Sequence, residues 1–218
     1  MQRRRVSVSD LTYEALKQNI IEFHYSPGQA LREEQLTEEI AVSRTPLRQA
    51  LYRLELEGLI VKKANGRMEV QALSIEEAVD IFAVREALEG LVAKEAAMRA
   101  SSESVAAMKE ALLHMAEADE RFTSITYGSR FHHLLYEHAS PTAVQFLNQL
   151  NSRLERYRRL SGYRHPDYTI DTPVSEHEKI LAAIEQKDGP AAEYYMRAHI
   201  RRSLASTKET LEFHISSF

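Results

Sequence analysis

The 218-residue sequence predicts a mainly α protein that consists of an N-terminal winged helix-turn-helix and a C-terminal, all-α bundle of six helices. Two observations carry this prediction. Residues 31–70 contain two short helical patterns, a tight turn and a two-stranded hairpin, in that order. From residue 74 onward, nearly every segment has helical periodicity and is bounded by caps, prolines or glycine. We therefore expect two domains, residues 1–73 and 74–218.

The first expected element is a helix that begins at Ser9 and Asp10 and ends before the turn at Pro27 and Gly28. Its predicted inner face holds Leu16, Ile20 and Phe23. The basic residues of segment 1–5 form either an arm near DNA or a solvated tail, and the sequence leaves both alternatives open.

The next two helices form the helix-turn-helix. Leu36 and Ile40, four residues apart, predict a short amphipathic helix. We expect the Ser43 hydroxyl to cap the following helix, and Pro46 falls in its first turn, where a missing N–H costs nothing. The predicted buried stripe of this second helix is Leu47, Ala50, Leu51 and Leu54.

Arg44, Thr45 and Arg48 lie off that stripe, at the start of the helix. The start of a recognition helix is the part that meets base edges and phosphates in the major groove. Arginine can bind guanine through two hydrogen bonds, and threonine offers a hydroxyl and a methyl group. These residues predict binding to double-stranded DNA.

A hairpin follows, with strands over 59–63 and 67–71. Asn65 and Gly66 suit a turn with positive φ at both central residues. The hairpin places positive charge beside the DNA backbone, on Lys62, Lys63 and Arg67.

The first 70 residues resemble the DNA-binding domain of the GntR family of bacterial transcription regulators. The resemblance is carried by Pro27-Gly28, by SRTPLR at 43–48 and by LELEGL at 54–59. Ala41 stands where the family usually has glycine in the helix-turn-helix bend. The resemblance implies DNA contacts by Arg44, Thr45, Arg48 and Gly66, supported by Ser43, Lys62, Asn65 and Arg67.

Charge and composition limit the alternatives. The net charge is −4, but residues 1–74 hold 11 Lys and Arg against 10 Asp and Glu, so positive charge is only local. The absence of cysteine excludes disulfides and thiolate metal sites and agrees with a cytoplasmic location. No stretch approaches the run of about 20 apolar residues that spans a bilayer, so we expect no membrane partner.

The C-terminal part is expected to be nearly all helix. Ser74 and Glu77 predict a capping box, and Gly128 weakens the helical pattern around it. The predicted helices cover about 74–100, 103–119, a stretch that reaches 138, 140–160, 174–186 and 190–213.

Three histidines, His132, His177 and His199, occupy positions where the helical stripe calls for an apolar residue. Three imidazoles from three helices suit a divalent ion such as zinc or nickel. Each histidine alone is more often a hydrogen-bonded core residue. Both interpretations remain open from the sequence.

The helical part resembles the C-terminal effector domain of the FadR-type subfamily of GntR regulators, in its VanR-like branch. Many such domains hold a metal through one aspartate and three histidines, which His132, His177 and His199 match, whereas Gly128 stands at the aspartate position. The resemblance implies a weakened metal site, in which water or a carboxylate effector takes the free position. The alternative is a regulator whose effector site has decayed.

Arg85 is another inward-facing residue, four positions before Glu89. It is either the partner of Glu89 in an ion pair within the helix, or a cavity cation that binds a carboxylate effector. Arg153 and Arg156 either line the same cavity or are solvated.

Together these patterns predict a cytoplasmic, ligand-responsive transcription regulator of bacterial type. We expect it to bind a near-palindromic operator as a homodimer, with an affinity that a small organic acid changes. The alternative is a metal-dependent hydrolase in which the three histidines activate water. The sequence has no paired carboxylates, nucleophile motif or phosphate loop beside the histidines, which favours the regulator.

Overall fold

The computed structural model describes residues 6–164 and 171–215, without the side chains of 161–164, 171 and 214–215, so the basic segment 1–5 lies outside the described residues. The chain divides into two compact units. One unit comprises Met1–Leu73 and Ser152–Arg156, and the other comprises Ser74–Asn151 and Tyr157–Phe218. The described residues are mostly helical, with one small sheet, which confirms the predicted fold class.

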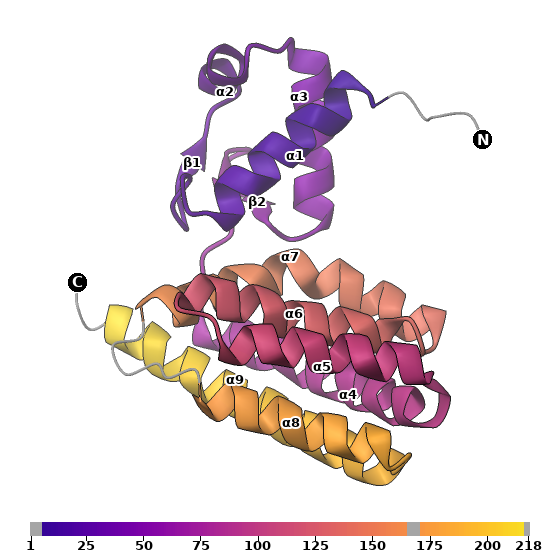
Figure 1. Cartoon of the computed structure of the whole chain (residues 1–218). Helices are drawn as coiled ribbons and strands as arrows, with labels where there is room; N and C mark the ends of the chain where they lie inside the picture. Colours follow the sequence, from indigo (N-terminus) through magenta and orange to yellow (C-terminus); the bar gives the residue numbers. More distant parts are fainter. Residues whose placement is uncertain (1–5, 165–170, 216–218) are drawn as a thin grey trace. The chain divides into compact units, whose positions relative to one another are not determined.

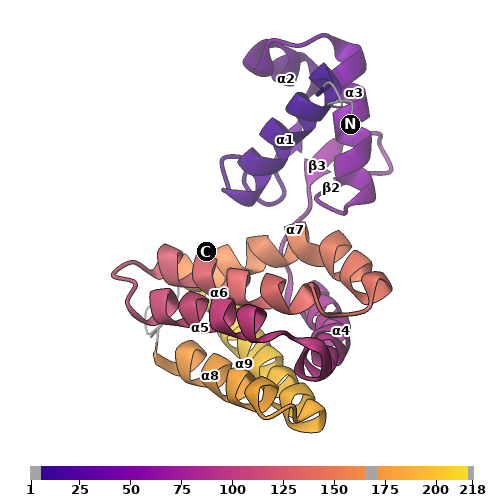
Figure 2. The same ribbon diagram turned by 45° about the vertical axis from the view of Figure 1, so that its right-hand side comes forward.

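The N-terminal unit is a winged helix-turn-helix with a three-stranded sheet (Figure 1). Its elements are α1 (Val8–Ile21), β1 (Ala30–Leu31), α2 (Glu33–Ile40), α3 (Arg44–Leu56), β2 (Ile60–Lys62) and β3 (Met68–Val70). The central strand β3 pairs antiparallel with β1 on one side and with β2 on the other. Figure 2 shows β2 and β3 side by side in the wing. The sequence did not predict β1, because two residues cannot display an alternating pattern.

The helix α1 begins two residues earlier than expected. Ser7 is its N-cap and forms a complete capping box with Asp10, whose backbone N–H donates to the Ser7 hydroxyl at 3.1 Å. Phe23 lies beyond the end of the helix with φ of 61°, and it is only half-buried, so its predicted place on the helical face was wrong. The core of this unit is apolar and includes Leu16, Ile20, Leu47, Leu51, Leu54, Ile60 and Val70.

The bend between α2 and α3 fixes the direction of the recognition helix. Ala41 adopts a left-handed conformation with φ of 56°, at the modest cost that alanine bears there. Val42 is partly buried and packs against the core. Ser43 occupies the N-cap position of α3, but its side chain makes no cap hydrogen bond, which corrects the expected hydroxyl cap.

The wing turn differs from the expected one. Only Gly66 has positive φ, at 79°, whereas Asn65 does not. The Gly66 N–H donates to the Lys63 carbonyl at 2.8 Å, and the Asn65 side chain accepts from the Arg67 N–H at 3.0 Å. This pattern belongs to a three-residue loop with a left-handed glycine rather than to a two-residue turn.

The second unit contains the six expected helices within the described residues. They are α4 (Ile75–Arg99), α5 (Ser102–Ala116), α6 (Arg121–Tyr136), α7 (Pro141–Arg164), α8 (Asp171–Glu185) and α9 (Gly189–Ile215). The long helices α4 and α9 pack along each other, α5 packs on α6 and α8, and α8 packs on α9 (Figure 1). In the described ranges, no helix combines the length and apolar character needed to cross a bilayer.

The start of α4 shows half of the predicted capping box. The Ser74 hydroxyl accepts from the Glu77 N–H at 3.1 Å. The Glu77 carboxylate instead accepts from the Tyr157 hydroxyl at 2.6 Å, while the Ser74 N–H donates to the same hydroxyl at 3.3 Å. Tyr157 therefore ties α7 to the start of α4.

Candidate functional site

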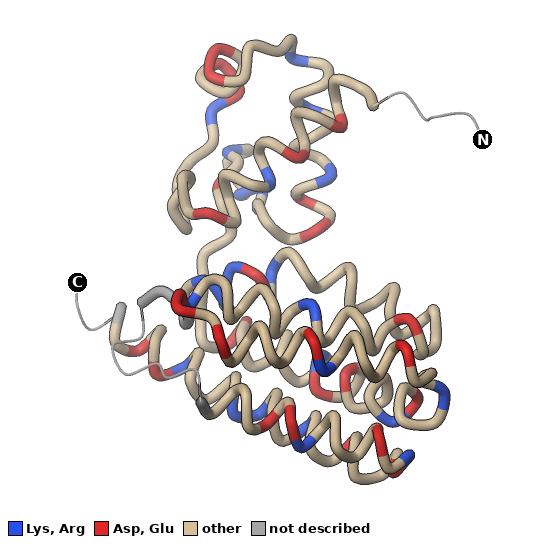
Figure 3. The backbone as a smooth tube through the Cα atoms, in the orientation of Figure 1, with Lys and Arg blue, Asp and Glu red and all other residues tan. Residues whose placement is uncertain are grey.

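The predicted DNA contacts lie on the exposed start of α3. Ser43 and Thr45 are exposed, and the side chains of Arg44 and Arg48 are 66% and 64% exposed. The Arg48 Nε donates to both carboxylate oxygens of Glu33, at 3.1 and 2.9 Å. Acidic residues gather on α2 (Figure 3). Because exposed ion pairs are worth only about 0–1 kcal/mol, DNA can displace this partner of Arg48.

The wing presents a second group of the predicted residues. Lys62, Asn65, Gly66 and Arg67 are all exposed, on β2 and on the loop that follows it. Lys63, which the sequence also placed here, lies 3.4 Å from the Glu69 carboxylate. The wing therefore presents exposed Lys and Arg side chains on a β-hairpin.

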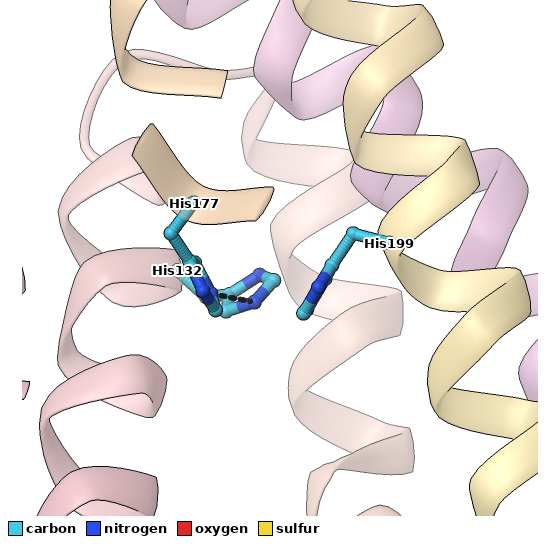
Figure 4. Close-up of side chains that lie close together, drawn as sticks. All are labelled: His132, His177 and His199. Carbon is cyan, nitrogen blue, oxygen red and sulfur yellow. Dashed lines mark hydrogen bonds between the residues drawn. The ribbon is translucent and has the colours of Figure 1, made fainter. Parts of the chain in front are cut away.

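The three predicted histidines meet inside the helical unit. His132 comes from α6, His177 from α8 and His199 from α9, and their rings converge (Figure 4). The three residues are only 3%, 3% and 7% exposed. One ligand atom from each lies within 4.8 Å of the other two.

Each imidazole is held through its Nδ1 atom. His177 Nδ1 donates to the Pro173 carbonyl at 2.7 Å, which requires a hydrogen on that nitrogen. His132 Nδ1 donates to Glu89 Oε2 at 2.9 Å, and His199 Nδ1 donates to Glu176 Oε2 at 2.8 Å. These bonds fix the tautomers and leave the three Nε2 atoms to act as ligands.

The electrostatics favour neutral rings and ionised partners. Burial lowers the pKa of His132 and of His199 to about 4, and that of His177 to about 3. Burial opposes ionisation of Glu89 and Glu176, but hydrogen bonds and nearby positive charge bring the pKa of each below its ordinary value. The carboxylates therefore accept, and the imidazoles donate through Nδ1.

The arrangement fits a bound cation. The Nε2 atoms of His132 and His177 lie 3.3 Å apart (Figure 4), and in these tautomers neither carries a hydrogen. Two nitrogens bound to one tetrahedral zinc, each at about 2.0–2.1 Å, lie about 3.3–3.4 Å apart. Two facing lone pairs at this distance are stabilised by a cation between them.

Arg85 and Glu89 form the ion pair within α4 that was one of the two sequence interpretations, and the pair is buried. The Arg85 Nε donates to Glu89 Oε1 at 3.3 Å, and their side chains are 3% and 0% exposed. Glu89 Oε1 also accepts from the Tyr136 hydroxyl at 3.0 Å. Since Glu89 also holds His132, one carboxylate joins Arg85 to the histidine cluster.

A cavity of about 100 Å³ lies beside the histidines. Its lining residues are Arg85, Met115, Ile125, Gly128, Ser129, His132, Arg158, Pro173, His177, His199, Arg202, Ser203, Ser206 and Thr207. Arg153 and Arg156, for which the sequence left open a place in the cavity wall or exposure to solvent, are not among these residues. Arg156 is not solvated either, because it is only 1% exposed. The sequence analysis missed Arg158 and Arg202. For Arg202 a signal existed, because it follows His199 by three residues and shares its helical face.

Gly128 faces the same site. A Cβ atom at this position would lie 3.8 Å from His177 Cε1 and 3.4 Å from Met115 Cε, which is ordinary van der Waals contact. A Cβ atom therefore fits at this position, which lines the cavity, and this chain has no carboxylate there.

The two units together define a class of protein, in which a DNA-binding fold is joined to a helical unit that encloses a polar cavity. Residues 9–70 match the model of the bacterial regulatory proteins of the gntR family, and residues 80–202 match the FCD domain. The chain belongs to the GntR family of bacterial transcription regulators, in the FadR-type subfamily that carries an FCD domain.

Relatives and solved structures agree with this assignment. The HTH-type transcriptional regulator YdhC of Bacillus subtilis (strain 168) is 26% identical over 204 residues, which cover 92% of this chain and 91% of the relative. The HTH-type transcriptional repressor RspR of Escherichia coli (strain K12) is 25% identical over 207 residues, which cover 93% of this chain and 90% of the relative. The family and these relatives are transcription regulators and not enzymes, which overturns the hydrolase alternative.

The solved structure of E. coli McbR/YncC has the same fold, with a TM-score of 0.74 at 19% identity, over 94% of this chain and 98% of that one. A transcriptional regulator from Rhodococcus sp. RHA1 gives a TM-score of 0.73 at 18% identity, over 92% and 97% of the two chains.

Proposed function

We propose that this regulator binds a near-palindromic DNA operator as a homodimer, in the cytoplasm, and that a divalent metal and a small carboxylate in the helical unit change its affinity for the operator. Residues 1–73 bind DNA in this proposal, and residues 74–218 bind the effector and form the dimer. The main support for this proposal is that one chain combines two features. It has exposed basic residues on a recognition helix, and it has a buried histidine cluster beside a cavity lined by arginines.

On the DNA side, Arg44, Thr45 and Arg48 contact base edges in the major groove. The exposure of these side chains at the first turn of α3 supports this role. The remaining proposed contacts go to the phosphate backbone and come from Ser43, Lys62, Asn65, Gly66 and Arg67.

On the effector side, His132, His177 and His199 would hold zinc or nickel through their Nε2 atoms. When bound, the metal supplies positive charge that attracts a carboxylate. Glu89 and Glu176 orient two of the imidazoles, and Arg85 adds a buried guanidinium to the cavity wall. Gly128 leaves room beside His177, which a carboxylate from the effector would use.

An effector changes operator affinity only if it binds the DNA-competent and DNA-incompetent arrangements differently. We infer that the occupied cavity alters the separation of the paired recognition helices in the dimer. Effector binding and DNA binding are then coupled, but a substitution in the cavity can remove the effector response and leave DNA binding intact.

The test uses the full chain and duplexes recovered by it from a random double-stranded library. Fluorescence anisotropy measures DNA affinity with and without zinc and a carboxylate, and elemental analysis measures bound metal. We expect His177→Ala to lose the metal and the ligand response while it still binds DNA. Metal that stays stoichiometric in His177→Ala would refute the proposed ligands, and failure to bind any duplex at low salt would refute the regulator itself.

A further inference from the structure

Hydroxyl side chains form much of the cavity wall beyond the histidines. Ser129 of α6 and Ser203 and Ser206 of α9 line the cavity, and each is partly buried. Thr207 also lines it, but its hydroxyl already donates to the Ser203 carbonyl at 2.8 Å.

The three serine hydroxyls are available to a ligand. Among the described residues, the hydroxyls of Ser129, Ser203 and Ser206 make no hydrogen bond to another protein group, although their backbone carbonyls accept bonds. A hydroxyl group that is partly shielded from water can form a hydrogen bond with a polar ligand. An apolar ligand instead displaces water from the hydroxyl and offers no hydrogen bond in return.

These hydroxyls continue the surface that the histidines begin. Ser203 follows His199 by four residues and Ser206 follows it by seven, so they share one face of α9. A helix rises about 1.5 Å per residue, which places them about 6 and 10 Å along α9 from His199. Ser129 precedes His132 by three residues on α6. A short molecule that touches the histidine cluster at one end therefore reaches the hydroxyls with the rest of its length.

The same cavity favours negative charge. Arg85, Arg158 and Arg202 contribute guanidinium groups to its wall, and two of these groups also pair with a carboxylate, Arg85 with Glu89 and Arg202 with Glu176. Both Arg85 and Arg158 line the cavity, and burial together with the positive charge of Arg158 lowers the pKa of Arg85 to about 10. An amino acid would bring its ammonium group toward these cations, whereas a carboxylate without an amine would not.

We propose that the effector is a short hydroxycarboxylate, with its carboxylate at the histidine cluster and the arginines and its hydroxyl groups paired with Ser129, Ser203 and Ser206. This inference rests on the proposed function, because it specifies the ligand of the same cavity. Selectivity follows from desolvation. An alkyl acid of equal length would leave the serine hydroxyls without partners, and a site built to bind hydroxyls rejects such analogues strongly.

The experiment compares matched acids on the full chain dialysed with one equivalent of zinc. Isothermal titration calorimetry measures γ-hydroxybutyrate against butyrate and ε-hydroxycaproate against caproate, in which the hydroxyl lies at the end remote from the carboxylate, and the zinc content is measured after each titration. We expect each hydroxy acid to bind at least tenfold more tightly than its alkyl partner. In the Ser203→Ala/Ser206→Ala variant the ratio should fall toward one, because the hydroxy acids lose their partners and the alkyl acids no longer leave serine hydroxyls unpaired. The control is Ser102→Ala, an exposed serine on α5, which should keep the wild-type ratio.

The outcomes distinguish failure of the hydroxycarboxylate assignment from failure of the proposed effector site. Equal binding within both pairs overturns the hydroxycarboxylate assignment and leaves the proposed carboxylate site intact. No binding of any of the four acids, with zinc retained, counts against the proposed effector site and so against this inference too. A ratio that survives in the double variant shows that other groups bind the hydroxyls.

Discussion

The two units use the same chemical pair in opposite surroundings. Arg48 and Glu33 form an ion pair in the N-terminal unit, where the arginine side chain is 64% exposed. Arg85 and Glu89 form one in the helical unit, where the arginine side chain is 3% exposed. Water screens the first pair, so Arg48 can exchange its partner for DNA at small cost. Arg85 cannot exchange its partner in this way, because an unpaired charge in the protein interior is strongly destabilising.

Function and stability are separable in the N-terminal unit and coupled in the helical unit. The core of the N-terminal unit is apolar, and its proposed DNA contacts lie outside it. In the helical unit Arg85, Glu89, His132, His177 and His199 are themselves buried. Substitutions in the first group should change binding alone, whereas substitutions in the second should change binding and folding together.

The largest expected effect is that of Glu89→Ala. The substitution removes the acceptor of Arg85, His132 and Tyr136 and leaves a buried guanidinium unpaired. We expect the free energy of unfolding of the helical unit to fall by about 3–5 kcal/mol, measured by urea denaturation with circular dichroism.

Two variants control this result. Asp80→Ala, at an exposed position of α4, should change the free energy of unfolding by less than about 0.5 kcal/mol. Glu89→Gln keeps an acceptor oxygen and should lie between the two. A Glu89→Ala protein as stable as Asp80→Ala would remove the proposed contrast between the units.

Arg48→Ala tests the exposed side of the comparison. We expect a loss of about 1–3 kcal/mol in DNA-binding free energy and relaxed sequence choice, because a base contact is lost. Stability should change by less than about 0.5 kcal/mol, since no buried group loses a partner. Anisotropy titrations at fixed salt measure the first quantity, and Gln49→Ala, the exposed neighbour, is the control. Unchanged DNA affinity would show that Arg48 does not contact the bases.

Gly128→Asp should tighten metal binding by about tenfold or more, because it places an anionic ligand beside three neutral ones. A Cβ atom fits at Gly128, and the position borders the cavity. Competition with a chromogenic chelator measures the affinity. Gly128→Asn adds the same volume without the charge and should give a much smaller gain. Equal gains in both variants would assign the effect to helix propensity rather than to charge.

The smallest effect is expected for Lys62→Ala on the wing. The loss of one phosphate contact should weaken binding to all duplexes by a similar small factor. The slope of log K against log salt should become shallower by about one. A change that depends on DNA sequence would instead place Lys62 near the bases.

Much of the fold follows from local sequence. The stripe that begins at Leu47, the proline in the first turn of α3 and the caps of the later helices depend on neighbours within one or two helical turns. Such signals predicted six C-terminal helices and the recognition helix. These local signals failed where pairing between residues far apart in the sequence determines the structure. One example is β1, whose two residues form a strand only because they pair with β3.

The sequence by itself determined that His132, His177 and His199 face inward, since each is on the apolar stripe of its helix. Only the tertiary structure decided that the three stripes meet at one place and that Glu89 and Glu176 hold the imidazoles by Nδ1. It also placed Arg158 in the cavity wall instead of Arg153 and Arg156. The physical reason is that helical periodicity fixes a side chain's direction about its own axis, whereas the packing of distant helices fixes what it meets there.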